Sequence, residues 1–281
     1  MSKQRKITLA VQLLHAAPLP FSWPVRLLVR ARIVIGYLGP RLKHGFRWIF
    51  RDTETSNFYY RLSELNRQQL AHFVAVITKT SHAQVLAFFA ELEGDSQLRH
   101  HLQRLLRESD QPSQIQVEFG RRLGWYAFTR IMKPRVVIET GVDHGVGACV
   151  LASALLRNIA EGFPGKYVGT EMRPDAGKLL AEPYTKVGRV IYGDSNTTLR
   201  AFSEEIDLFI NDSDHSADYE YDEYTSIASK ISESALVIGD NSHVTNKLAE
   251  WSVENGRKFL FFSEKPQEHW YPGAGIGVSF P

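Results

Sequence analysis

The feature that most constrains this chain is an alternation, beginning after Pro134, between short runs of β-branched residues and longer segments with helical spacing. The runs are Val136–Ile138, Tyr167–Gly169, Val190–Tyr192, Ile206–Ile210 and Ala235–Ile238. Strands that alternate with crossover helices form parallel βαβ units in an open sheet. Two further runs, Phe259–Phe262 and Ile276–Phe280, are joined by a loop too short for a packed crossover helix. We therefore predict an α/β fold with a Rossmann-like, doubly wound sheet that ends in an antiparallel hairpin.

Before Pro134 the apolar residues recur with helical spacing and strand signals are few. One stripe runs from Leu62 to Ile77, a second from Val85 to Leu92, and a polar segment, Glu108–Gln114, reads as a loop. Residues 115–132 are expected to form a last helix that leads into the sheet. This predicts two regions, a helical N-terminal region at 1–114 and an α/β domain at 115–281.

The composition is that of a globular protein, with 43% hydrophobic and 23% charged residues. The single cysteine, Cys149, cannot form an internal disulfide, which fits a reducing compartment and a cytoplasmic location. The apolar segment Ile7–Ala17 is interrupted by Gln12 and His15, and a second one, Trp23–Leu38, carries three arginines. Neither predicts a transmembrane helix, because charges are costly in hydrocarbon.

The net charge of +2 hides a segregation of charges along the chain. Ten of the 33 basic residues precede Asp52, which is the first acidic residue, so the remainder is acidic overall. Residues 21–51 interleave aromatic and aliphatic side chains with Arg and Lys, a pattern that suits an anionic membrane surface and peripheral membrane association. Helices packed on the domain with solvated basic faces, or a homo-oligomer interface, explain the same pattern. Nucleic-acid binding is not expected, because no nucleic-acid motif follows Arg51.

Ligands of open α/β sheets bind beyond the carboxyl ends of the strands, so the residues there are the candidate site. The first strand ends in Glu139 and a turn with glycines at 141, 145 and 147. This turn lets a ligand approach the backbone but lacks the dinucleotide spacing. Glu171 follows the second strand and is placed to accept ribose hydroxyls, or to cap a helix near Pro174. Asp194 and Ser195 follow the third strand, where they face a purine or cap a helix.

The ends of the fourth and fifth strands carry Asp212 and His215, and Asp240 and Asn241. Carboxylate and amide oxygens from two adjacent strand ends suit a hard divalent cation such as Mg²⁺, although some of these residues can instead cap helices. His215 has the side chain best suited to take a proton near neutral pH.

In the order and spacing of these motifs, residues 115–280 resemble a class I S-adenosylmethionine-dependent methyltransferase. The resemblance implies that family's seven-stranded sheet with a reversed last strand, and S-adenosylmethionine as cofactor. Within the family the closest resemblance is to metal-dependent catechol and macrolide-sugar O-methyltransferases, which implies metal ligands at Asp212, Asp240 and Asn241 and a general base at His215. Asp212 is also expected to be catalytic. The cofactor-binding residues so implied are Glu139, Thr140, Gly141, Gly145, Gly147, Glu171, Met172, Asp194, Ser195 and Asp212.

The sequence therefore predicts a magnesium-assisted O-methyltransferase that acts on a hydroxyl of a sugar, glycolipid or natural product. A metal could stabilise the acceptor alkoxide while a histidine accepts its proton. One alternative is a metal-independent methyltransferase of the same fold that acts on nitrogen or carbon. The other is a non-catalytic protein that binds a membrane surface.

Overall fold

The computed structural model describes residues 19–51, 54, 58–108 and 116–281. The basic residues near the N-terminus, the segment Ile7–Ala17 and nearly all of the predicted loop Glu108–Gln114 lie outside this part of the chain. The chain divides into two compact units, Met1–Arg51 with Glu268–Tyr271, and Asp52–Gln267 with Pro272–Pro281. The predicted functional division at residues 114 and 115 stays a prediction.

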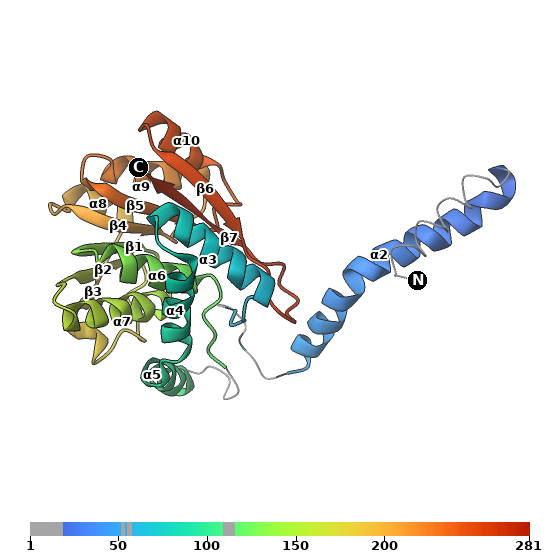
Figure 1. Ribbon diagram of the computed structural model, residues 1–281, viewed down its shortest axis with the longest axis horizontal. Helices are drawn as coiled ribbons and strands as arrows, with labels where there is room; N and C mark the ends of the chain where they lie inside the picture. Colours follow the sequence, from blue (N-terminus) through green and yellow to red (C-terminus); the bar gives the residue numbers. More distant parts are fainter. Residues whose placement is uncertain (1–18, 52–53, 55–57, 109–115) are drawn as a thin grey trace. The chain divides into compact units, whose positions relative to one another are not determined.

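In the described part of the larger unit, seven strands form one sheet (Figure 1). The strands are β1 (Val136–Thr140), β2 (Lys166–Glu171), β3 (Gly188–Tyr192), β4 (Ile206–Asn211), β5 (Ile231–Asp240), β6 (Lys258–Ser263) and β7 (Gly275–Phe280). Their order is β3-β2-β1-β4-β5-β7-β6, and β7 runs antiparallel to both β5 and β6. The predicted doubly wound sheet with a reversed last strand is confirmed.

Helices cover both faces of this sheet (Figure 1). On one face lie α8 (Ser195–Ala201), α9 (Ala217–Ile227) and α10 (Lys247–Glu254), and the core between them and the strands contains Phe209, Tyr224 and Trp251. The other face is covered by α6 (Arg122–Met132) and α7 (Val146–Ala160). The whole of β1 is buried, as expected for the central strand of a sheet covered on both faces.

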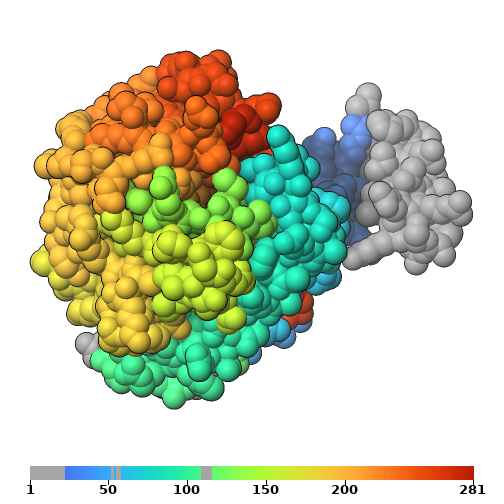
Figure 2. Space-filling model, turned by 60° about the vertical axis from the view of Figure 1, so that its left-hand side comes forward, coloured from blue at the N-terminus to red at the C-terminus, as the bar shows by residue number. Residues whose placement is uncertain are grey.

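Three more helices, α3 (Glu64–Thr78), α4 (His82–Glu93) and α5 (Ser96–Glu108), pack against α6 and α7. Figure 2 shows these cyan and turquoise segments lying against the green ones. Ser63 and Ser81 cap the first two helices by accepting hydrogen bonds from the backbone N–H groups of Asn66 and Gln84. These helices therefore belong to the same compact unit as the sheet.

Two predicted helices differ from the structure. The helix predicted at 115–132 begins only at Arg122, because Gly120 adopts φ +51° against the ring of Tyr60 and interrupts the helical backbone. No α-helix follows β2, where a helix near Pro174 was considered. There the backbone N–H groups of Gly177 and Leu179 donate to the carbonyls of Asp143 and His144 instead, and only the 3₁₀ turn η1 (Tyr184–Lys186) forms before β3.

In the smaller unit the described structure includes the long helix α2 (Leu19–Ile49). It contains Pro24 and Pro40 and has no acidic residue in its first turn. Most of its described side chains are exposed, including Leu28 and Ile35. Among the described residues, no single helix has both the length and the apolar composition required to cross a membrane.

Candidate active site

The carboxyl ends of the central strands lie level with one another. In the parallel register, Thr140 of β1 is opposite Thr170 of β2 and Asn211 of β4, and Asn211 is opposite Gly239 of β5. A cavity of about 420 Å³ opens at this edge. Its lining includes the predicted residues Glu139, Gly141, Gly147, Glu171, Met172, Ser195 and Asp212, together with Arg121, Arg122 and Tyr219.

The glycines of the β1–α7 turn allow close packing at the cavity wall. Gly141 has φ +78°, and a Cβ atom there would lie 2.0 Å from the carbonyl oxygen of Asp212. A Cβ atom at Gly147 would lie 2.3 Å from a carboxylate oxygen of Glu139. Side chains at these two positions would therefore force the turn away from the end of β4 or from Glu139.

Glu139 is buried beneath the turn, with 1% of its surface exposed, and its carboxylate accepts a hydrogen bond from the hydroxyl of Tyr167. Burial raises its pKa to about 8, although the hydrogen bond from Tyr167 and the charge of Arg122 act in the opposite direction. The neutral acid is therefore favoured in the folded protein at neutral pH.

Glu171 ties the glycine turn to the end of β2. One of its carboxylate oxygens accepts the backbone N–H of Asp143 at 2.9 Å, and the other accepts that of Arg173 at 3.0 Å. Since no α-helix begins at Pro174, helix capping does not explain this residue. Glu171 and Met172 both line the cavity, and their contact with a ribose stays a prediction.

Asp194 and Ser195 meet Tyr219 of α9. Asp194 caps α8 by accepting the N–H of Thr197 at 2.6 Å, and it also accepts the hydroxyl of Tyr219 at 2.8 Å. The hydrogen bond from Thr197, and to a lesser extent the one from Tyr219, lower the pKa of Asp194. The Ser195 hydroxyl lies 2.8 Å from that of Tyr219. Asp194 therefore does cap a helix, as the second interpretation predicted. Asp194 and Ser195 also contact Tyr219, whose role the sequence did not predict.

Glu223, one turn further along α9, bonds to residues at or just after the ends of β1, β3 and β4. Its carboxylate accepts hydrogen bonds from Thr140, Ser195, Asn211 and Ser213. Burial raises its pKa to about 7 against the effect of these four donors. Thr140 therefore supports the site from within the fold and does not line the cavity.

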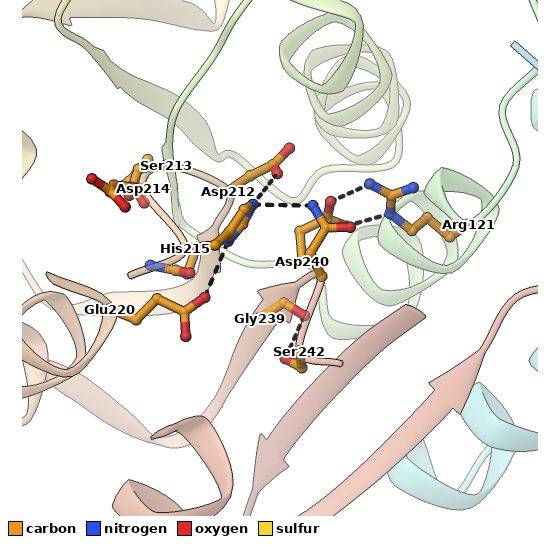
Figure 3. Close-up of polar contacts among 12 residues, drawn as sticks. Arg121, Asp212, Ser213, Asp214, His215, Glu220, Gly239, Asp240 and Ser242 are labelled. Atoms are coloured by element: carbon orange, nitrogen blue, oxygen red, sulfur yellow. Dashed lines mark hydrogen bonds and ion pairs between the residues drawn. The ribbon is translucent and has the colours of Figure 1, made fainter. Parts of the chain in front are cut away.

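His215 is held by partners on both sides of its ring (Figure 3). Its Nδ1 lies 3.1 Å from Glu220 of α9, and its Nε2 lies 3.0 Å from the Nδ2 of Asn241 and 3.7 Å from Asp212. Since Glu220 is an acceptor and the Asn241 amide nitrogen is a donor, these contacts assign the proton to Nδ1 and the lone pair to Nε2. In this tautomer Nε2 is able to accept a proton while Nδ1 stays bonded to Glu220; the role of His215 as general base stays a prediction.

Asp240 pairs with Arg121, which immediately precedes α6 (Figure 3). The Arg121 Nε donates to Asp240 Oδ1 at 2.5 Å, and its Nη2 donates to Oδ2. Burial would raise the pKa of Asp240, but the charge of Arg121 outweighs it and holds this pKa below its usual range. The pKa of neighbouring Asp212 is well above its usual range because of burial and the charge of Asp240. The negative charge of the pair therefore resides on Asp240.

The three predicted metal ligands are close together, but Asp240 does not fit a cation as its side chain lies. Both oxygens of Asp240 bond to Arg121, whereas Asn241 contacts His215 through its amide nitrogen, which is not a metal-binding atom. Within the described ranges, no group of three or more His, Cys, Asp or Glu side chains is arranged to hold a metal ion. Mg²⁺ at this site stays a prediction from the sequence.

Sequence reasoning missed Arg121, Tyr219, Glu220 and Glu223. The last three belong to the first turns of α9, and the spacing of Tyr219 and Glu223 places them on one helix face. That spacing was a usable signal. Arg121 lies outside any motif, upstream of the first strand, and only the packing of the chain reveals its position.

Comparison with known proteins finds a family match for the part of the chain that contains this site. Residues 138–242, which include the glycine turn, Glu171, His215 and Asp240, match a family model described as a methyltransferase domain. A search of curated proteins finds no match.

Solved structures share the fold of this part of the chain. They include cofactor-bound Rv0187 from MTB, with a TM-score of 0.55 and 15% identity over 68% of this chain and 92% of that one. An O-methyltransferase from Bacillus cereus in complex with SAH has a TM-score of 0.52 and 15% identity, over 66% of this chain and 90% of that one. A putative O-methyltransferase from Klebsiella pneumoniae has a TM-score of 0.53 and 13% identity, also over 66% of this chain and 90% of that one. This part of the chain therefore has the same fold as these O-methyltransferase structures.

The raised pKa of Glu139 makes a prediction about stability. Because the folded protein holds this proton up to about pH 8 while the unfolded chain releases it near pH 4.5, raising the pH destabilises the fold across this interval. In urea unfolding from pH 5 to 8.5, Glu139→Gln should gain free energy of unfolding relative to wild type. The gain should approach roughly 1.4 kcal/mol per pH unit before levelling off.

Glu161→Gln is the control, because ion pairs with Arg130 and Lys133 at the surface lower the pKa of Glu161 to about 2. Both states of that residue are ionised above pH 5.5, so its difference from wild type should stay constant there. A Glu139→Gln difference that is equally constant would contradict the assignment.

Proposed function

We propose that this protein is an S-adenosylmethionine-dependent O-methyltransferase that acts on a hydroxyl group of a small molecule. The observation that carries the proposal is the His215–Glu220 pair beside a cavity built from the glycine turn of a methyltransferase domain. A hydroxyl is a poor nucleophile while it is protonated, so its methylation calls for a positioned base.

The cofactor proposal assigns the cavity to S-adenosylmethionine, which supplies a methyl group on a cationic sulfonium. Glu139, Gly141, Gly145 and Gly147, with Thr140 behind them, would surround its amino-acid portion near the start of α7. Glu171 and Met172 would hold the ribose, and Asp194 and Ser195 would lie on the adenine side. Support comes from similar folds described as bound to SAH or to a cofactor, and from the six of these residues that line the cavity: Glu139, Gly141, Gly147, Glu171, Met172 and Ser195.

Within this proposal His215 accepts the hydroxyl proton at Nε2, and Glu220 stabilises the resulting imidazolium through Nδ1. The acceptor oxygen must displace the amide of Asn241, which bonds Nε2 in this structure. Asp212 lies on the cavity side of the ring and positions the acceptor. The oxygen then forms its bond to the methyl carbon as the carbon–sulfur bond breaks.

The acceptor proposed from the sequence is a sugar, glycolipid or natural product. The presence of a base favours oxygen over the alternative of nitrogen, because a neutral amine is already a good nucleophile whereas a neutral hydroxyl is not. Transfer to carbon remains the other form of the first alternative. The acceptor assay below separates transfer to oxygen from transfer to nitrogen.

A second proposal concerns α2, which suits peripheral binding to an anionic membrane. An uncharged stripe runs along the helix at spacings of three or four residues: Leu27, Ala31, Val34, Leu38, Leu42, Phe46 and Ile49. Leu42, Phe46 and Ile49 are each at least 60% exposed. Six basic residues lie off this stripe on the same helix, at positions 26, 30, 32, 41, 43 and 47. A helix with these two faces lies in the membrane interface.

Calorimetry with S-adenosylmethionine tests the enzyme proposal before any acceptor is known. The wild type should bind, and Glu171→Ala should weaken binding at least tenfold because it removes the expected ribose contact. Glu182→Ala, at an exposed position on the same connection, should bind like wild type. Absence of binding by the wild type would refute the enzyme proposal and favour the non-catalytic alternative.

Methyl transfer to a panel of alcohols, phenols and amines then tests the role of His215. His215→Gln should retain cofactor affinity but lose on the order of 10²- to 10⁴-fold in rate on a hydroxyl acceptor. The exposed His243→Gln serves as the matched control. Transfer only to amines, or an unchanged rate in His215→Gln, would contradict the proposed O-methylation.

Co-sedimentation of the full chain with liposomes tests the proposal for α2. Binding should increase with the fraction of anionic lipid and fall with added salt. Replacing Arg26, Arg30 and Arg32 by Gln should weaken it on the order of 100-fold, at about 1 kcal/mol per charge. The same change at three exposed arginines elsewhere should have a much smaller effect: Arg61, Arg104 and Arg135. Equal losses in the two triple variants would argue against a specific role of α2.

A further inference from the structure

The carboxylate predicted to hold a metal already has a cation beside it. Asp240 has no exposed surface, and its two oxygens each accept a hydrogen bond from a different nitrogen of Arg121. This fork geometry is the favourable way for a guanidinium to bind a carboxylate. A buried carboxylate needs such a partner, because burying its charge alone is costly.

Arg121 is fixed from its other side as well. Its Nη1 donates to Glu264 at 3.0 Å and to the hydroxyl of Tyr60 at 3.2 Å. That hydroxyl donates to the same Glu264 oxygen at 2.6 Å, and the backbone N–H of Ala274 bonds this oxygen at 2.7 Å. Groups from the end of β5, the residue that follows β6 and the segment before α3 thus hold the guanidinium in one position.

This arrangement leaves little scope for a divalent ion at Asp240. An arginine side chain keeps its charge at every physiological pH, so an entering ion would meet a permanent positive charge at the same oxygens. Displacing Arg121 would separate it from both Asp240 and Glu264, whose side chains are fully buried.

We propose that the Arg121 guanidinium takes the place of the divalent cation, so that this protein methylates its acceptor without a metal ion. The inference rests on the proposed O-methyltransferase function and names the charge that serves its acceptor oxygen. Arg121 lines the cavity, and its bonds to Asp240, Glu264 and Tyr60 use four of the five N–H donors of a guanidinium. We assign the remaining hydrogen, on Nη2, to the acceptor oxygen.

Titration with Mn²⁺, followed by the electron paramagnetic resonance signal of the free ion, tests this on the intact wild-type chain. The signal should match that of a protein-free solution up to millimolar Mn²⁺. Affinity for S-adenosylmethionine should be the same, within twofold, in EDTA and in 5 mM MgCl₂. Binding of one Mn²⁺ per chain that is lost in Asp240→Asn would overturn the inference.

A variant makes the test reciprocal. Arg121→Met frees the oxygens of Asp240, and a folded Arg121→Met protein should bind Mn²⁺ at least tenfold more tightly than wild type. Adding Asp240→Asn should abolish that gain, and Arg61→Met, at an exposed ion pair, should behave like wild type. A folded Arg121→Met that binds no Mn²⁺ would show that the arginine is not what excludes the ion.

If Arg121→Met does not fold, the wild-type titration still decides. Failure of the proposed function is distinguishable from failure of this inference. The former appears as absent S-adenosylmethionine binding in calorimetry, whereas the latter appears as Mn²⁺ binding by a wild-type protein that binds the cofactor.

Discussion

The parallel pairing of β1 with β2 and β4 is the constraint on which the site depends. It sets the ends of neighbouring strands at one level, so residues far apart in the sequence face a common cavity. The contact of the β1–α7 turn with the end of β4 is then so close that Gly141 has no space for a side chain. Register and turn together place Asp212 beside the turn that precedes α7.

Much of the fold and part of the site follow from local sequence signals. Each buried strand is a run of β-branched or aromatic residues, and polar residues directly after such a run must lie at the sheet edge, as Glu171 and Asp212 do. The reversed last strand follows from the short connection before it. The absence of an α-helix after β2 does not follow locally, because Gly177 and Leu179 form backbone bonds to a distant turn.

The electrostatics of the site could not be read from the sequence for a related reason. Asp212, Asp240 and Asn241 have the composition of a magnesium site, and only tertiary packing shows that Arg121, 119 residues from Asp240, already bonds one of these carboxylates. Likewise, Glu220 contacts the His215 ring only because the fold brings the first turn of α9 back beside it. Residue types at strand ends are a local property, whereas the charges that face them depend on the whole fold.

Helix α9 links the His215 side of the site to the Asp194 side. Tyr219, which contacts the Asp194 side chain, and Glu220, which bonds His215, are consecutive residues on one rigid element. Successive residues of a helix point about 100° apart, so a small rotation of α9 would shift both contacts together. Glu223, bonded to three strand ends at once, opposes such a rotation. One helix thus sets the position of His215 relative to the Asp194 side chain.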